Sequence, residues 1–102
     1  MLDKVKTVLR IFNTAYDTEI QLLIDSCKAD LGLAGVNCNK TVEVLVDEVT
    51  TNVVDPLIEQ AIMLYCKGNF GYDENAERFR EAYLKLKMAL ALSVEYEVVT
   101  VV

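Results

Sequence analysis

The side chains that could do chemistry in this chain are three cysteines and a large number of carboxylates. Cys27, Cys38 and Cys66 are far apart in the sequence, and there is no histidine to complete a zinc site. Cys38 lies between two asparagines, where no neighbouring charge would activate its thiol as a nucleophile. Cys27 and Cys66 fall within helical patterns, where a free cysteine behaves as a small hydrophobic residue. The sequence therefore predicts no metal site and no catalytic cysteine.

The carboxylates also show no catalytic pattern. The chain has 16 Asp and Glu residues, and each lies where a helix cap or a solvated face would place it. There is no Gly-rich phosphate loop and no serine beside a base, so no cofactor is expected. A paired-carboxylate hydrolase is the remaining enzymatic alternative, because two acids far apart in the sequence can meet in space. We expect that the protein is not an enzyme.

The composition is that of one folded domain covering residues 1–102. A chain of 102 residues, 53% of them hydrophobic and 25% charged, has room for one hydrophobic core. No stretch reaches the roughly 18 consecutive apolar residues of a membrane-spanning helix, so we expect a soluble protein without a membrane partner. An odd number of dispersed cysteines fits a reducing cytosol.

The net charge of −6 is concentrated in two segments. Residues 36–55 sum to −3 and residues 93–102 to −2, whereas residues 1–35 sum to −1 and residues 56–92 to 0. An acidic surface repels the phosphate backbone, so tight or sequence-specific DNA binding is not expected. Such a surface suits a protein that lets DNA pass without binding it, although solubility alone also explains the charge.

Four stretches have the apolar spacing of helices, so we predict a mainly all-α fold, a small bundle of about four helices. The first stretch ends near Asn13 and has Phe12 on its apolar face. The second is capped by Asp17 or Thr18 and ends between residues 32 and 35. Its predicted buried stripe consists of Ile20, Leu23, Ile24, Cys27 and Leu31.

The third stretch has the clearest start, because Asp55 is a good N-cap and Pro56 suits the first helical turn. Gly68 and Gly71 should break this helix. Its predicted apolar face is formed by Leu57, Ile58, Ala61, Ile62 and Tyr65. The fourth helix should bury Phe79, Tyr83, Leu86 and Leu90. On its surface, acids and bases four residues apart should pair, namely Glu74 with Arg78 and Glu81 with Lys85.

Two segments look extended, residues 36–54 and a C-terminal tail at 93–102. Valines alternate with other residues at 41–50 and at 94–102, as in a β-strand, although residues 42–49 also fit a short helix. An unpaired strand leaves backbone groups unsatisfied, so the two segments should pair with each other or with a neighbouring molecule. The candidate assembly or partner contacts are Val42, Val44, Val46, Val94, Tyr96, Val98, Val99 and Val101. The candidates for an acidic rim or lumen are Glu43, Asp47, Glu48, Glu95 and Glu97.

The order of these features resembles that of the small head-tail connector, or adaptor, proteins of tailed phages and prophages. The resemblance rests on LDKVKTVLRI, YDTEIQLLIDSCKADLGLAGV, DPLIEQAIMLYCKGNFG and ERFREAYLKLKMALALSVEY, which together cover most of the chain. These stretches consist of packing and capping residues rather than a catalytic fingerprint. The chain departs from the family pattern in the acidic, valine-rich stretch at 36–54 and in the apolar tail after Tyr96.

The resemblance implies a structural role in virion assembly. Such proteins form a ring of about a dozen copies beneath the portal protein after DNA packaging, extend the DNA channel and join the head to the tail. The implied partners are further copies of the chain, the portal protein and the next neck or tail-completion protein, with DNA only as passing cargo. The implied locations are the host cytoplasm during assembly and then the neck of the virion.

Two other functions are compatible with the residues. A generic helical interaction module would dimerise through the apolar tail and form a small closed oligomer. A helix-turn-helix DNA binder would use the third and fourth helices, but Glu74, Glu77 and Glu81 on the candidate recognition helix argue against this.

Overall fold

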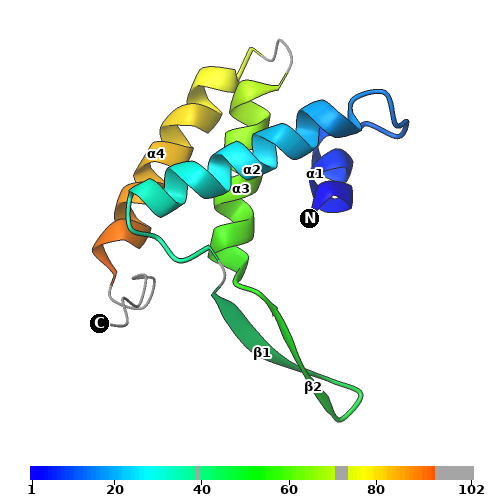
Figure 1. The fold of residues 1–102 in the computed structure, drawn as a ribbon, viewed down its shortest axis with the longest axis vertical. Helices are drawn as coiled ribbons and strands as arrows, with labels where there is room; N and C mark the ends of the chain where they lie inside the picture. The colour runs from blue at the N-terminus through cyan, green and yellow to red at the C-terminus, as the bar shows by residue number, and fades with distance from the viewer. Residues whose placement is uncertain (39, 71–73, 94–102) are drawn as a thin grey trace.

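The fold contains four helices and one β-hairpin, as seen in a computed structural model that describes residues 1–38, 40–70 and 74–93. At residues 42, 44, 46, 51 and 54 the structure describes the backbone alone. In chain order the elements are α1 (Leu2–Leu9), α2 (Asp17–Leu33), β1 (Thr41–Val46), β2 (Val49–Val54), α3 (Pro56–Asn69) and α4 (Ala76–Leu92) (Figure 1). The predicted mainly helical fold with four helices is confirmed.

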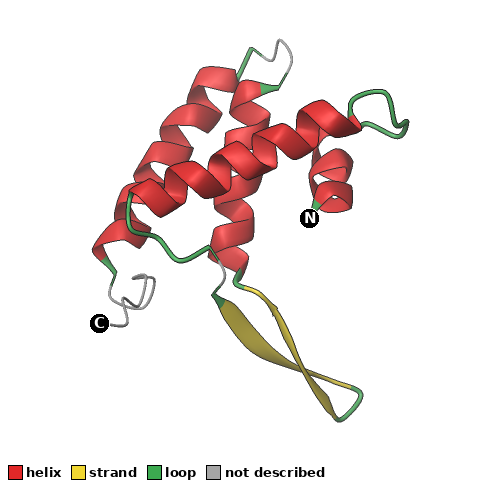
Figure 2. Ribbon diagram, viewed as in Figure 1, coloured by secondary structure: helices red, strands yellow, loops and turns green. Residues whose placement is uncertain are grey.

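The helices pack around one another while the hairpin points away from them. Helices α3 and α4 run side by side, α2 crosses over them, and α1 packs against α2 and α3. Figure 2 shows the hairpin leading into the start of α3 and extending beyond the helices. The buried core consists of Val5, Ile20, Ile24, Cys27, Leu31, Val36, Ile58, Ala61, Ile62, Cys66, Tyr83 and Leu90. The predicted stripes of the second and fourth helices therefore face this core, with Leu23 and Leu86 partly buried against it. Phe79 is partly buried.

Helix α1 is shorter than its apolar spacing predicts. Its C-cap, Arg10, has φ 59° and ψ 41°, a left-handed backbone that turns the chain out of the helix. The helix therefore ends at Leu9, and Phe12 is 86% exposed instead of packing on the apolar face. The prediction for Phe12 was wrong because a left-handed cap at an arginine leaves little signal in the sequence.

The start of α2 is not held by a side-chain cap. The N-cap residue is Tyr16, and neither Asp17 nor Thr18 caps the helix as predicted. Asp17 instead lies in the first turn and forms an ion pair with Lys6 of α1, with 2.6 Å between Nζ and Oδ1. A carboxylate in the first turn is still favourable, because it faces the positive end of the helix dipole.

The start of α3 is as predicted. The Asp55 carboxylate accepts a hydrogen bond from the backbone N–H of Leu57 at 2.9 Å, and Pro56 occupies the first helical position. Leu57 itself is 41% exposed, so its assignment to the apolar face was wrong. Gly68 does not break the helix but lies within its last turn, where an added Cβ would lie 2.7 Å from Cγ of Arg80. This glycine is therefore a point of close approach between α3 and α4.

The predicted surface ion pairs of α4 are not formed. Among the described side chains, the ion pairs link separate helices: Lys4 with Glu59, Lys6 with Asp17 and Lys87 with Asp30. Glu74 and Arg78 do not pair, and neither do Glu81 and Lys85. Exposed pairs of this kind gain little free energy, so their absence has little effect on the helix.

The segment at 36–54 pairs with itself and forms a hairpin. Strands β1 and β2 are antiparallel, and the register places Val46 opposite Val49. Asp47 and Glu48 form the two-residue turn with φ values of 49° and 63°, the backbone of a type I′ turn. The alternative helix at 42–49 was therefore wrong. Pairing of this segment with the tail or with a neighbouring molecule stays a prediction. The tail at 94–102 lies outside the described residues.

Candidate assembly surfaces

The hairpin is a strand pair with no helix packed along its length. The backbone N–H of Asp55 donates to the carbonyl of Lys40 at 3.1 Å and closes the base of the hairpin. Farther out, Leu45 is 72% exposed and Val49 is 59% exposed. A two-stranded hairpin alone is marginally stable in water, and both of its outer edges offer unpaired backbone groups. The hairpin is therefore a surface that a partner would stabilise.

The register gathers the predicted assembly valines of β1 on one face of the hairpin. Val42, Val44 and Val46 lie opposite Val53, Thr51 and Val49, and directly opposed residues share a face. We call this face, positions 42, 44, 46, 49, 51 and 53, the valine face. Its members are β-branched at every position. The other predicted contacts, Val94, Tyr96, Val98, Val99 and Val101, lie outside the described residues.

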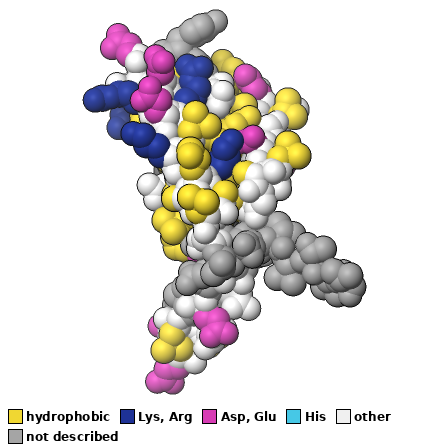
Figure 3. Space-filling view, turned by 90° about the vertical axis from the view of Figure 1, so that its left-hand side faces the viewer, with side chains coloured by type: hydrophobic (Ala, Val, Ile, Leu, Met, Phe, Trp, Pro, Cys, Tyr) yellow, Lys and Arg dark blue, Asp and Glu magenta, His cyan; other side chains and the backbone are white. Residues whose placement is uncertain are grey.

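The predicted acidic residues of this segment lie along β1 and at the free end of the hairpin. Glu43 is on β1, Asp47 and Glu48 form the turn, and all three are exposed. Figure 3 shows acidic side chains at the projecting end of the hairpin. Residues 41–54 contain no lysine or arginine, so the hairpin carries a charge of −3. Glu95 and Glu97 lie outside the described residues.

A second exposed apolar surface, which the sequence analysis missed, lies on α4. Leu84, Met88 and Leu92 are 49%, 64% and 84% exposed. They are spaced four residues apart and so lie on one side of the helix, opposite the stripe that includes Tyr83. With Lys85 and Ala89, which are also exposed, we call them the α4 outer face. Figure 3 views the molecule from this side and shows hydrophobic side chains gathered there.

A polar cluster joins α2 to α4 beside the core. The Tyr83 hydroxyl donates to Oδ2 of Asp30 at 2.5 Å, and Nζ of Lys87 lies 3.0 Å from the same oxygen. The hydrogen bond from Tyr83 and then the charge and hydrogen bond of Lys87 lower the pKa of Asp30. Burial, together with the bond to Asp30, raises the pKa of Tyr83. Tyr83 therefore stays protonated as a donor, and the cluster is a link between helices rather than an acid-base pair.

Burial also governs the thiols. It raises the pKa of Cys27 to about 12 and that of Cys66 to about 11. The pKa of Cys38 is raised as well, because burial outweighs the nearby Lys28. A nucleophilic thiol needs a lowered pKa, so these environments disfavour cysteine chemistry. Among the described residues there is no group of His, Cys, Asp and Glu side chains that could hold a metal ion.

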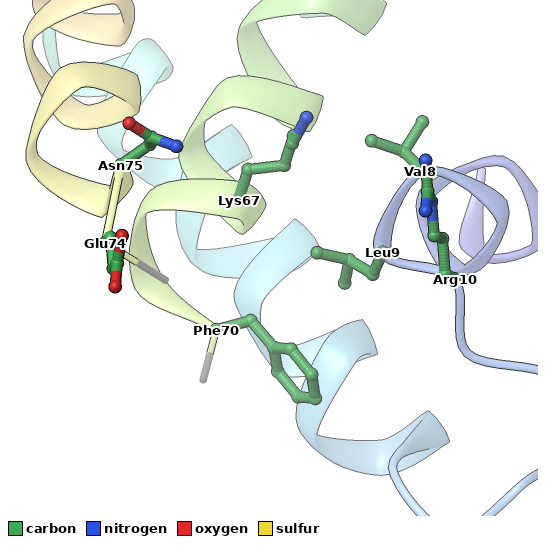
Figure 4. A pocket seen from close by; sticks show the side chains of 7 residues that line it. All are labelled: Val8, Leu9, Arg10, Lys67, Phe70, Glu74 and Asn75. Carbon is green, nitrogen blue, oxygen red and sulfur yellow. The ribbon is translucent and has the colours of Figure 1, made fainter. Parts of the chain in front are cut away.

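A cavity of about 650 Å³ lies between the end of α1 and the adjacent ends of α3 and α4. Its lining residues are Val8, Leu9, Arg10, Lys67, Phe70, Glu74 and Asn75, shown in Figure 4. Lys67 makes a cation–π contact, because its ammonium lies 4.4 Å from the centre of the Phe79 ring. The lining mixes apolar, basic and acidic groups and does not form a catalytic arrangement.

The described part of the chain is thus a helical body with one projecting hairpin and one exposed apolar helix face. Within it, no helix is long and apolar enough to span a membrane. The family model described as "Phage connector protein" matches residues 1–97. The chain therefore belongs to the phage connector protein family, a structural rather than an enzymatic family. Comparisons with curated proteins and with solved structures gave no match.

Proposed function

We propose that this phage connector protein assembles into a ring beneath the portal, extends the DNA channel and joins the head to the tail. The resemblance noted above gives about a dozen copies for the ring. The observation that carries the proposal is the hairpin, which projects from the helices with Leu45 and Val49 exposed. A projecting element can reach a different surface on a neighbouring copy, and repeated contacts between two different surfaces lead to rings or filaments.

The acidic hairpin residues fit the rim or lumen of such a ring. Glu43, Asp47 and Glu48 are exposed and have no basic neighbour within residues 41–54. In a ring, this charge would be repeated in every copy and would repel the phosphates of DNA passing through. Glu95 and Glu97 would add to the same charge. Packaged DNA would then pass through the channel without being held.

The tail is the proposed arm toward a partner. Val94, Tyr96, Val98, Val99 and Val101 make it apolar, and an apolar extended segment can add a strand to a neighbour or dock in a groove. The partner would be a neighbouring copy, the portal protein or the next neck or tail-completion protein. Deleting residues 94–102 tests this role directly. Ring formation and portal binding that survive the deletion would remove the tail from the mechanism.

The first test is the mass in solution, measured by light scattering over a concentration series with negative-stain images of the largest species. A ring of about a dozen subunits with an open centre supports the proposal. A small closed oligomer, such as a dimer, supports a generic interaction module instead. A monomer calls for co-sedimentation with purified portal rings, because the portal could template assembly. Binding to portal rings supports the proposal, and a lack of binding contradicts it.

Location in the infected cell follows from the same proposal. The protein would accumulate in the host cytoplasm during assembly and then occupy the neck of the finished virion. Antibody labelling of virions by electron microscopy tests this second step. Label at the head-tail junction is expected, and label on the capsid surface or tail tip would contradict it.

A further inference from the structure

We propose that the hairpin of one copy docks with its valine face on the α4 outer face of the next copy. This inference rests on the proposed ring and identifies the two surfaces that build it. The occupant of each surface is a second copy of the same chain. Both surfaces are apolar, their charges are opposite, and they lie in different places on the molecule.

Each of the two surfaces has exposed apolar groups that the other would cover. On the hairpin, Val49 and Val53 of the valine face are 59% and 39% exposed. On α4, exposure rises along the helix from Leu84 to Leu92. A six-residue strand is about 20 Å long, and the rise from residue 84 to residue 92 is about 12 Å. The hairpin is therefore long enough to cover the whole apolar part of α4.

The charges of the two surfaces are opposite. The hairpin carries −3 within residues 41–54, whereas the bases of α4 exceed its acids by four to two over residues 76–92. One of these bases, Lys87, already pairs with Asp30 at 3.0 Å. Lys85 lies on the α4 outer face and has no ion-pair partner among the described residues. It is therefore available to Glu48 at the hairpin tip of a neighbouring copy, and Glu43 and Asp47 then carry the unpaired acidic charge of the rim or lumen.

The placement of the surfaces excludes contact within one copy. Figure 1 shows α4 along one side of the helical body, whereas the hairpin leaves the N-terminal end of α3, at the same end of the body as the C-terminus of α4, and points away from α4. Each copy thus offers one hairpin and one α4 outer face in different places. Contact between these unlike surfaces is heterologous, and repeated heterologous contacts close into a ring when the rotation between copies permits it.

Cysteine cross-linking between two single variants tests the contact. Both variants are made in a Cys38→Ser background, which leaves the two buried native thiols. One carries Val49→Cys and the other Met88→Cys, and the mixture is treated with a short bismaleimide. Leu22→Cys on α2 is the matched control for Met88, because both side chains are 64% exposed. Leu45→Cys, on the opposite hairpin face, is the matched control for Val49.

We expect a mixed dimer from Val49→Cys with Met88→Cys, at about tenfold the yield of either control pair, which corresponds to 1.4 kcal/mol. A single chain with both substitutions should give a ladder of dimers, trimers and larger species. Val49→Cys linking only to itself would instead indicate contact between two hairpins. If Val49→Cys gave the same yield of mixed dimer with Leu22→Cys as with Met88→Cys, the cross-links would reflect random collision. Either of these results, or no mixed product at the highest soluble concentration, overturns the proposal.

Charge reversal gives an independent readout that leaves the apolar surfaces intact. Adding Lys85→Glu to the Met88→Cys chain should lower the yield of mixed dimer several-fold, and adding Glu48→Lys to the Val49→Cys chain should restore it. An unchanged yield would remove the charge contact from the interface. Portal co-sedimentation separates this inference from the proposed function. Portal binding without mixed dimer contradicts the interface alone, and mixed dimer without portal binding contradicts the function alone.

Discussion

Replacing Tyr83 by phenylalanine should weaken the link between α2 and α4 while keeping the aromatic packing. The substitution removes the hydroxyl that donates to Asp30 at 2.5 Å. A hydrogen bond to a charged group contributes about 1.5–3 kcal/mol. The Asp30 side chain is 37% exposed, so solvent screening reduces this to about 1–2 kcal/mol. Tyr83→Phe should therefore lower the free energy of unfolding by about 1–2 kcal/mol at pH 7.

The loss should depend on pH in a direction set by Asp30. The hydrogen bond from Tyr83 lowers the pKa of Asp30 from its ordinary value of 3.8. The folded state therefore binds fewer protons than the unfolded state between these two pKa values, and it gains stability as the pH rises. This stabilisation is fully present above 3.8 and is lost as the pH falls through the folded pKa. The difference between wild type and Tyr83→Phe should be constant near neutral pH and shrink in acid.

Urea unfolding followed by circular dichroism measures both effects. With an m value of about 1.5 kcal/mol/M, the midpoint should fall by about 1 M at pH 7. Tyr65→Phe is the matched control, because its ring lies 5.1 Å from that of Tyr83 and its hydroxyl makes no hydrogen bond to a described residue. The control should stay within about 0.5 kcal/mol of wild type. Equal losses in both variants, or a loss that grows in acid, would refute the reasoning.

Three further substitutions or titrations test other parts of the fold. Asp55→Ala should cost about 1 kcal/mol in thermal unfolding because it removes the α3 cap, and no change would mean that the cap contributes nothing. Gly68→Ala should cost about 1–3 kcal/mol because its Cβ meets α4 at 2.7 Å, whereas Gly32→Ala, with nothing within 4 Å, should be neutral or stabilising. In native protein, Ellman's reagent should modify Cys38 alone, and the two buried thiols should react only after unfolding; three fast thiols would contradict the packed core.

The helical body could be predicted from the sequence because its signals are local and agree with one another. Apolar spacing located the core face of α2, and an Asp-Pro pair located the start of α3. These signals are strong because a 3.6-residue period has one buried side and because Pro fits the first turn. Several failures, among them Phe12 and the cap of α2, occurred at helix ends, where a left-handed residue or a packing contact decides and the sequence carries little information.

The hairpin was only half predicted. Valine alternation indicated strands, but the turn was missed because Asp47-Glu48 has no glycine, and type I′ turns usually carry Asn-Gly or Asp-Gly. Two non-glycine residues at positive φ are costly, about 1–2 kcal/mol each. The candidate contacts at Val42, Val44 and Val46 stay a prediction. The structure adds the register of the hairpin, which places these three positions on one face together with the β2 residues opposite them.

The α4 outer face shows why periodicity alone leaves assembly surfaces hidden. The stretch LKLKMALAL has leucine or methionine on both sides of the helix, whereas the predicted buried stripe covers only one side. Leu84, Met88 and Leu92 keep the same four-residue spacing as a buried stripe, yet they are exposed in the single copy. A contiguous exposed apolar face on a small protein is typical of an interaction site. Because the chain's own hairpin points away from it, the cover that we propose is the hairpin of another copy.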